Sequence, residues 1–262
     1  MKKRLSFPVL AAWGSLLVVL IFPAPAAFAQ EQVQVQKAKI FQDEYQMILE
    51  SDLYCSIFVH QGERPPLRII GSERQKEKGL LSDADVFYVD KGRADGLEIG
   101  QMFLIVGLAQ DVAGFGPLAK RKGRARVIRL EEHQAAVRID KACGAVEVGD
   151  YVLPYEDKEG VLGRDLGYGD LDPAAGKRGK VIYLETDFNI TGAGHWAIID
   201  LGLDQGIRLG QQLTVFKRAS PNLPREAVGN IIVIDLQKET ATVKLLSGRD
   251  AVEMGDEVQT KG

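Results

Sequence analysis

The chain has 262 residues, of which 45% are hydrophobic and 26% are charged, and these fractions are ordinary for a globular protein. Its formal net charge of −3 favours solubility and gives no reason to expect a nucleic-acid surface. If the leader described next is removed, roughly 230 residues remain, which is enough for two modest domains.

The first 29 residues have the build of a secretory signal. Three basic residues at positions 2–4 precede an apolar run over 9–22, and cleavage is predicted between Ala29 and Gln30. Cleavage leaves 30 Lys and Arg residues against 36 Asp and Glu residues, a net charge of −6. We therefore expect a periplasmic chain without a stable membrane span. The alternative is an uncleaved signal that anchors the chain in the inner membrane, because the apolar run approaches the shortest spans of about 17 residues.

The next segment, residues 30–50, alternates Gln with Val and then places large apolar residues at roughly helical spacing. These residues are Ile40, Phe41, Tyr45, Ile48 and Leu49. The spacing predicts a short amphipathic helix at the N-terminus of the mature chain.

From residue 69 onward, short apolar runs alternate with turns rich in Gly and Asp, which predicts an all-β chain. The expected strands cover residues 69–70, 86–89, 102–106, 125–130, 135–139 and 151–153, and then 181–184, 197–199, 212–216, 231–236, 241–245 and 257–258. Each set of six predicts one small antiparallel barrel, because closure removes exposed strand edges.

The two sets of strands are copies of each other. Residues 123–152 align without a gap with residues 229–258 at an offset of 106, and 12 of the 30 pairs are identical. Upstream, Asp90, Gly92, Gly96, Gly100 and Gln101 recur at an offset of 110 as Asp200, Gly202, Gly206, Gly210 and Gln211. Nearly all of the repeated residues are glycines, turn residues or apolar residues, so the duplication indicates a shared scaffold.

The repeated glycines predict tight turns between the second and third strands of each copy. They supply positions where the backbone needs a positive φ or approaches another backbone closely. Between these glycines, Leu97 and Ile99 are expected to point into the first core, and Ile207 and Leu209 into the second.

The predicted domain limits follow from these patterns. The signal covers residues 1–29, the N-terminal segment 30–50, the first barrel repeat 51–155, a linker 156–177 and the second barrel repeat 178–262. The linker is expected because residues 156–179 are rich in Gly, Asp and Lys and poor in large apolar residues.

Cys55 and Cys143 are the two cysteines of the chain, and both fall within the first copy. An exported protein meets an oxidising compartment, which allows the two to form a disulfide. The alternative is two buried thiols that pack as small hydrophobic side chains.

The reactive side chains form no motif that predicts a catalytic, metal or cofactor site. No histidine has a second His or Cys at metal-ligand spacing, and neither Ser56 nor Ser247 lies in a nucleophile elbow. The turn from Asp90 to Gly96 lacks the alternating acidic ligands of a calcium loop. Carboxylate neighbours such as Glu131 and Glu132 lie in apparent turns, where solvated side chains are expected.

One charged feature indicates a binding surface. Five of the seven residues from 120 to 126 are basic, namely Lys120, Arg121, Lys122, Arg124 and Arg126. They could form a patch for an anionic envelope polymer or for lipid head groups. The alternative is a hairpin whose alternate side chains are solvated, with lysines that discourage edge pairing.

The repeat pattern resembles a family of exported bacterial envelope proteins. In the second copy it reads Asp200-x-Gly202-x-x-x-Gly206-Ile207-x-x-Gly210-Gln211-x-x-x-Val215, then Gly229-x-x-x-Val233, Ala241-x-Val243 and Gly255-Asp256-x-Val258. It is similar to the C-terminal domain of the flagellar assembly protein T, an SH3-like barrel, and to repeats that accompany LysM modules. The likeness covers about residues 66–155 and 178–260.

The resemblance implies two tandem SH3-like barrels in a non-enzymatic periplasmic protein that binds an envelope protein or peptidoglycan, without a cofactor. The alternative is an envelope hydrolase, or an accessory subunit of one, with a site between the barrels. Glu131, Glu132 and His133 would then cluster in a cleft with another titratable group.

Overall fold

The computed structural model describes residues 44–74, 79–172, 174–185, 189–220 and 222–261. The predicted signal, its cleavage point at Ala29 and Gln30, and the N-terminal segment up to residue 43 lie outside the described residues. Within them the fold is all-β, which confirms the predicted class. No helix in the described part of the chain is both long and apolar enough to span a membrane.

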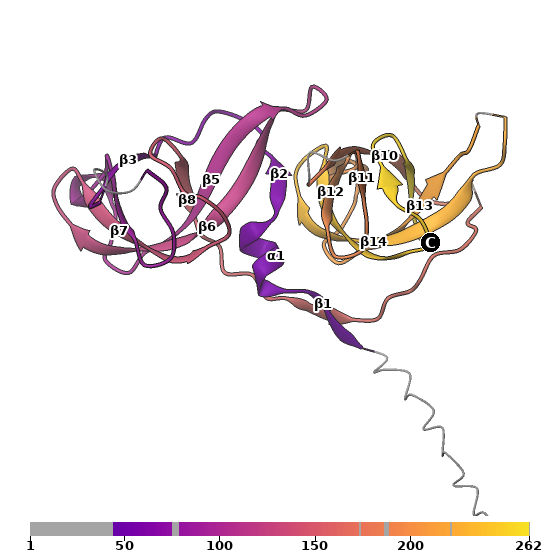
Figure 1. The fold of residues 1–262 in the computed structure, drawn as a ribbon, viewed down its shortest axis with the longest axis horizontal. Coiled ribbons are helices and arrows are strands. Elements are labelled where there is room, and N and C mark those ends of the chain that lie inside the picture. The colour runs from indigo at the N-terminus through magenta and orange to yellow at the C-terminus, as the bar shows by residue number, and fades with distance from the viewer. Residues whose placement is uncertain (1–43, 75–78, 173, 186–188, 221, 262) are drawn as a thin grey trace, which may run out of the picture. The chain divides into compact units, whose positions relative to one another are not determined.

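The second copy forms a closed six-stranded antiparallel barrel, drawn in brown to yellow in Figure 1. The strands follow the order β10 (Arg178–Leu184), β12 (Trp196–Ile199), β15 (Ala241–Gly248), β14 (Glu226–Leu236), β13 (Gln212–Lys217) and β17 (Glu257–Thr260). Pairing of Lys180 with Glu257 closes the ring. Beside it, β11 (Ile190–Thr191) and β16 (Val252–Glu253) form a two-stranded ribbon.

The first copy forms a seven-stranded sheet whose main path has the same strand order. The strands are β3 (Ile69–Ser72), β4 (Val86–Val89), β7 (Ala135–Ala142), β6 (Pro117–Leu130), β5 (Met102–Asp111) and β8 (Tyr151–Pro154), and β2 (Ile57–Val59) pairs with β6 off this path. Backbone hydrogen bonds link the two ends of the path: Ile69 N donates to Asp150 O at 2.8 Å, and Val152 N donates to Leu67 O at 2.9 Å.

The residues that the copies share occupy equivalent positions in the two cores. Val127 pairs with Val137 across β6 and β7, and Val233 pairs with Val243 across β14 and β15. All four side chains are buried. Each copy therefore surrounds its own apolar core, as the period-2 alternation of its strands predicts.

The repeated Gly92 and Gly202 mark a close approach of two backbones. A Cβ atom at Gly92 would lie 2.6 Å from Gln134 N, and a Cβ atom at Gly202 would lie 2.6 Å from Thr240 N. Any other residue would clash with a neighbouring turn, so both copies need glycine here. Each of these glycines precedes a short 3-10 helix, η1 (Arg93–Asp95) or η2 (Leu203–Gln205).

Two of the residues expected to point inward after these glycines are exposed, so that part of the prediction is wrong. Ile207 is buried and Leu97 packs partly against the first core, but Ile99 is 70% exposed and Leu209 is 55% exposed. Gly100 N and Gly210 N donate to Val127 O and Val233 O at 2.9 Å each. These bonds fix the turn backbone against the core strand and leave the preceding side chain outside.

The described end of the N-terminal segment, residues 44–50, differs from the predicted helix. Residues Tyr45–Ile48 form strand β1, and a helix, α1, follows only at Glu50–Cys55. Strand β1 pairs with β9 (Val161–Gly163), which lies within the predicted linker. A pairing partner more than 100 residues away thus decides the conformation, and helical spacing within the segment could not reveal that partner.

A turn that recurs at the end of each copy contains an aspartate, buried at Asp150 and partly buried at Asp256. Asp150 accepts a hydrogen bond from Glu147 N at 2.7 Å, and Asp256 accepts one from Glu253 N at 2.8 Å. Burial raises the pKa of both carboxyl groups above the ordinary value, despite these bonds and the nearby lysines. The native fold therefore holds a proton on these groups more tightly than the unfolded chain does.

We expect Asp256→Asn to be more stable than the parent at pH 7, because the amide keeps an acceptor oxygen without the disfavoured charge. The advantage should disappear as the pH falls below about 3.9, where the unfolded carboxyl is also protonated. The urea midpoints of the parent and the variant, measured from pH 3 to pH 8, would show this pH dependence. Asp83→Asn is the opposite control, because hydrogen bonds from Ala142 N and Lys141 lower the pKa of Asp83. A loss of stability at pH 7 in both variants would contradict this assignment.

Candidate functional site

The five predicted patch residues all lie on β6, but four of their side chains form ion pairs with different carboxylates. Arg121 pairs with Asp235, Lys122 with Asp150 at 2.9 Å and with Glu147 at 3.3 Å, Arg124 with Glu50, and Arg126 with Asp140 at 3.2 Å. Lys120 is exposed and has no ion-pair partner among the described residues. The exposed charge of an anionic-partner patch would therefore lie mainly on Lys120 and the half-exposed Arg126, and the patch stays a prediction.

Arg121 forms the centre of a buried polar cluster. Its Nη1 donates to Ser56 Oγ at 2.7 Å, its Nη2 pairs with the carboxylate of Asp235, and its guanidinium lies 4.3 Å from the centroid of the Phe58 ring. Asp235 also lies 3.5 Å from Lys158 Nζ. A buried charge is tolerated only where partners such as these replace water. The cluster borders a cavity of about 280 Å³.

Ser56 and Phe58 belong to residues 45–59, which comprise β1, α1 and β2 and which we call the N-terminal strap. On the first copy, the strap pairs β2 with β6 and forms a disulfide between Cys55 and Cys143. The Cα atoms of the two cysteines are 5.4 Å apart, within the range that a disulfide requires. The guanidinium of Arg124 stacks on the ring of Tyr54 at 4.9 Å.

The same strap makes polar contacts with the closed barrel. Asp52 is only 3% exposed, and it accepts hydrogen bonds from Trp196 Nε1 at 3.1 Å and from Lys244 Nζ at 2.6 Å. Thr242 Oγ1 donates to Ile57 O at 2.6 Å. These donors lie on β12 and β15. The N-terminal strap is thus fixed to residues of both copies.

Apolar contacts reinforce this attachment. Met47 and Ile48 pack on Ile232 and Ile234 of β14, and these four form one buried cluster. Strand β14 is therefore buried on both faces, because the alternate residues Ile231 and Val233 lie in the barrel core. This double burial explains why β14 has a continuous apolar run instead of alternating with polar residues.

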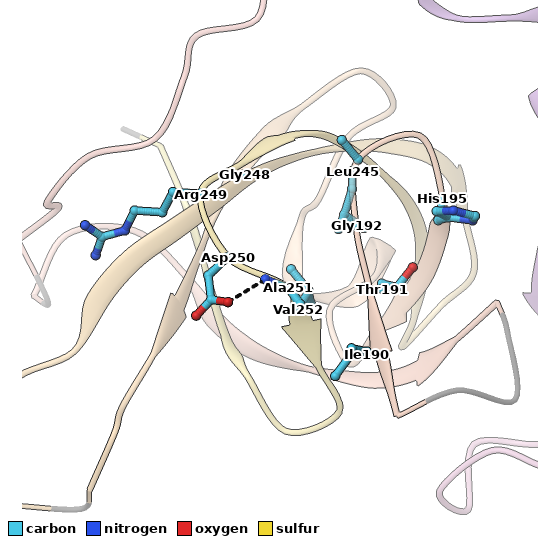
Figure 2. Close-up of a pocket in the computed structure, with 11 residues that line it drawn as sticks. Ile190, Thr191, Gly192, His195, Leu245, Gly248, Arg249, Asp250, Ala251 and Val252 are labelled. Carbon is cyan, nitrogen blue, oxygen red and sulfur yellow. Dashed lines mark hydrogen bonds between the residues drawn. The ribbon is translucent and has the colours of Figure 1, made fainter.

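A separate pocket of about 660 Å³ lies at one end of the closed barrel (Figure 2). Small residues form much of its lining, and Figure 2 shows the side chain of Arg249 directed away from them. Asp250 accepts a hydrogen bond from Ala251 N at 2.8 Å, and His195 Nδ1 lies 3.3 Å from Glu185 Oε2 outside the lining. The pocket offers room for a small apolar group, and its lining contains no adjacent nucleophile and base.

The first copy has other side chains at two of the equivalent positions. Asp83, at the position of Ala193, accepts hydrogen bonds from Ala142 N at 2.6 Å and from Lys141 Nζ at 3.0 Å. Cys143, at the position of Arg249, is tied to the strap. The lining of the pocket is therefore not shared between the two copies.

The titratable residues named for the hydrolase alternative lie in the exposed turn between β6 and β7. Glu131, Glu132 and His133 are all exposed, and Glu132 makes only a loose ion pair of 3.9 Å with Arg93. Within the described ranges, no three His, Cys, Asp or Glu side chains are placed to hold a metal ion. These three side chains thus face solvent and line none of the cavities described above.

The sequence gives no direct indication of the buried polar contacts of Asp52, Trp196 and Lys244 or of the pairing of Asp235 with Arg121. They are separated by up to 192 residues, and none belongs to a short motif. A weak signal exists in Asp235, which directly follows the apolar run 231–234, and in Lys244, which lies between Val243 and Leu245. No family model matches the chain, and no curated protein matches its sequence.

Removal of Arg121 should be costly because it leaves Asp235 buried with only part of its compensation. We expect Arg121→Met to lower the free energy of unfolding by about 3 kcal/mol. Lys120→Met is the matched control, since the neighbouring side chain is exposed, and its effect should stay within about 0.5 kcal/mol. Urea unfolding of both variants measures the difference. Equal effects would show that the Arg121–Asp235 pair does not stabilise the fold.

Loss of the disulfide should release one attachment of the strap. Cys55 and Cys143 are 88 residues apart in the sequence, so their link is worth on the order of 4 kcal/mol in the chain-entropy account. The double variant Cys55→Ala/Cys143→Ala should lower the free energy of unfolding by about this amount. The parent with its disulfide reduced should unfold at about the same urea concentration as the double variant. A variant as stable as the oxidised parent would contradict this expectation.

Proposed function

We propose that this chain is a non-enzymatic structural or interaction protein of the bacterial cell envelope, exported to the periplasm and built from two tandem SH3-like barrels. Its loops and outer strand faces would hold an envelope protein or peptidoglycan, without a cofactor. The observation that carries the proposal is the N-terminal strap, because Asp52, Ser56 and Cys55 attach one short segment to both copies.

Two further observations support this function. The residues repeated in both copies serve as core, turn and close-approach positions, so the duplication kept a scaffold and let the surfaces differ. The disulfide between Cys55 and Cys143 suits an oxidising compartment, as expected for an exported chain. The sequence resemblance to envelope proteins with SH3-like repeats points in the same direction.

The hydrolase alternative has less support. It needs Glu131, Glu132 and His133 to converge in a cleft, whereas these side chains are exposed in a turn. General acid and base groups act on a reacting group held within hydrogen-bonding reach, and an exposed turn provides no wall to hold one.

Chemical crosslinking in intact cells that make the protein would test the proposed partner. The chain would be recovered by an affinity tag, with and without muramidase treatment of the envelope. Recovery of muropeptides on the tagged chain supports wall binding, and recovery of the same protein in both samples supports a protein partner. Recovery of neither would overturn an envelope-binding function.

A matched pair of variants tests whether the basic residues of β6 contribute to binding of the envelope. Lys120→Glu reverses the charge of an exposed residue, whereas Lys180→Glu reverses an exposed charge on β10 of the other copy. If an anionic polymer contacts the predicted patch, Lys120→Glu should reduce the recovered muropeptide several-fold and Lys180→Glu should not. Equal recovery from both variants would remove the patch from the proposal.

A further inference from the structure

The outward face of three adjacent strands in the closed barrel is polar and yet buried. Along β13, Leu213 and Val215 point into the core, so Gln212 and Thr214 point outward. Thr214 pairs with Asn230 of β14 on one side and with Gln259 of β17 on the other. We call this surface, with Arg225 and Lys261 at its edge, the amide face. Thr214, Asn230 and Gln259 are fully buried, and Gln212 nearly so.

Residues 164–172, which the sequence assigns to a linker, cross the amide face and bury it. The hydrogen bonds go mostly to main-chain atoms of this segment. Gln212 Nε2 donates to Arg164 O at 2.7 Å, and its Oε1 accepts from Leu166 N at 3.0 Å. Arg225 Nη2 donates to Leu171 O at 3.0 Å, and Lys261 Nζ donates to Gly167 O. Such contacts recognise a peptide backbone whatever its side chains are.

One side chain of the segment is recognised as well. The carboxylate of Asp165 accepts a hydrogen bond from Asn230 Nδ2. Burial alone would raise the pKa of Asp165, but hydrogen bonds from Ser247, Gly167 N and Asn230, together with the charge of Lys261, hold it below the ordinary value. This position therefore selects an ionised carboxylate.

The segment contributes little packing of its own. Leu166 is 64% exposed, and no residue of 164–172 belongs to a buried apolar cluster in the described chain. Its fit to the amide face is also incomplete, because Thr214 Oγ1 is buried without a hydrogen bond and Arg225 Nη1 makes only a long ion pair of 3.8 Å with Glu257. Buried polar atoms without partners weaken binding, so a better-matched peptide could take the place of this segment.

The first copy uses the equivalent face in the same way with different chemistry. There Leu104 and Leu153 stand at the positions of Thr214 and Gln259, and Phe58 of the N-terminal strap packs on them. In both copies, then, a segment from elsewhere in the chain covers this face. The first copy holds its segment by apolar contact and strand pairing, and the second holds it by side-chain amides.

We propose that the amide face of the second copy is a binding site for an extended peptide of a partner protein, which carries a carboxylate at the place of Asp165. Residues 164–172 occupy the site within the same chain and leave when the partner peptide binds. This inference deepens the proposed interaction function and rests on it, since it names the surface and the class of partner. Little packing is lost when the partner peptide replaces residues 164–172, because these residues are held by hydrogen bonds that the partner peptide also makes.

A synthetic peptide with the sequence of residues 164–172, labelled with a fluorophore, tests the site by fluorescence anisotropy. The first protein is the parent, and the second has residues 164–172 replaced by a Gly-Ser linker of equal length. We expect the peptide to bind the second protein and to bind the parent at least about tenfold more weakly, because a tethered competitor acts at an effective concentration on the order of mM. Equal binding to both proteins, or none to the second protein while it still unfolds cooperatively, would overturn the proposal.

Variants of the peptide and of the face separate recognition from nonspecific binding. Changing Asp165→Asn in the peptide should weaken binding about tenfold or more, whereas Leu166→Ala should leave it within about twofold, since Leu166 is exposed. Asn230→Leu in the linker-replaced protein should abolish binding, and Lys180→Ala, on another part of the barrel, should not. Loss of binding by the Leu166→Ala peptide, or unchanged binding to the Asn230→Leu protein, would also overturn the proposal.

Hydrogen exchange in the unaltered protein tests the site without relying on a replacement variant that folds. The N–H of Leu166 is bonded to Gln212 on the amide face, whereas the N–H of Val233 is bonded to Gln211 O within the barrel. Saturating peptide should speed exchange at Leu166 several-fold and leave Val233 unchanged. No change at Leu166 would refute the exchange of segments, while the crosslinking experiment would still judge the envelope function separately.

Discussion

The carboxylate of Asp52 is almost completely removed from water, and the fold depends on how this charge is balanced. A buried carboxylate is costly unless donors surround it, and here the donors Trp196 and Lys244 come from the closed barrel while the helix that carries Asp52 is tied to the first copy. The N-terminal strap therefore completes its contacts only when both copies are folded. A change at any of these residues affects the attachment of the strap to its partners and not the local helix alone.

The local architecture was predictable because its causes are local. Alternation of apolar residues located the strands, and the repeated Gly92 and Gly202 mark places where one backbone passes close to another. The exposed Ile99 and Leu209 were predicted wrongly, because a backbone hydrogen bond to a distant strand turns them outward. Apolar periodicity does not encode such a bond.

The candidate site was harder to predict, because its residues act in pairs that are remote in the sequence. The basic run on β6 looked uniform in the sequence, but strand geometry turned Arg121 inward and left Lys120 in solvent. Which lysine or arginine becomes buried depends on where Asp235 lies, and only the folded chain places it. Likewise, the Gly-rich composition of residues 156–177 is typical of a linker, whereas the buried amides that hold part of it lie 40 to 90 residues further on.

The sequence distances within these contacts have a consequence for the order in which the protein forms. The strap and Cys143 can form their link once the first half of the chain is in an oxidising compartment, but Asp52 has to wait for Lys244, which is 192 residues away. Until then Asp52 remains in water, at little cost, on a segment that the disulfide already holds beside the first copy. A chain interrupted before β15 would therefore leave Asp52 and the Met47–Ile48 pair of the strap without a barrel to cover them. Quality-control factors that recognise exposed apolar surface would bind the chain at this pair.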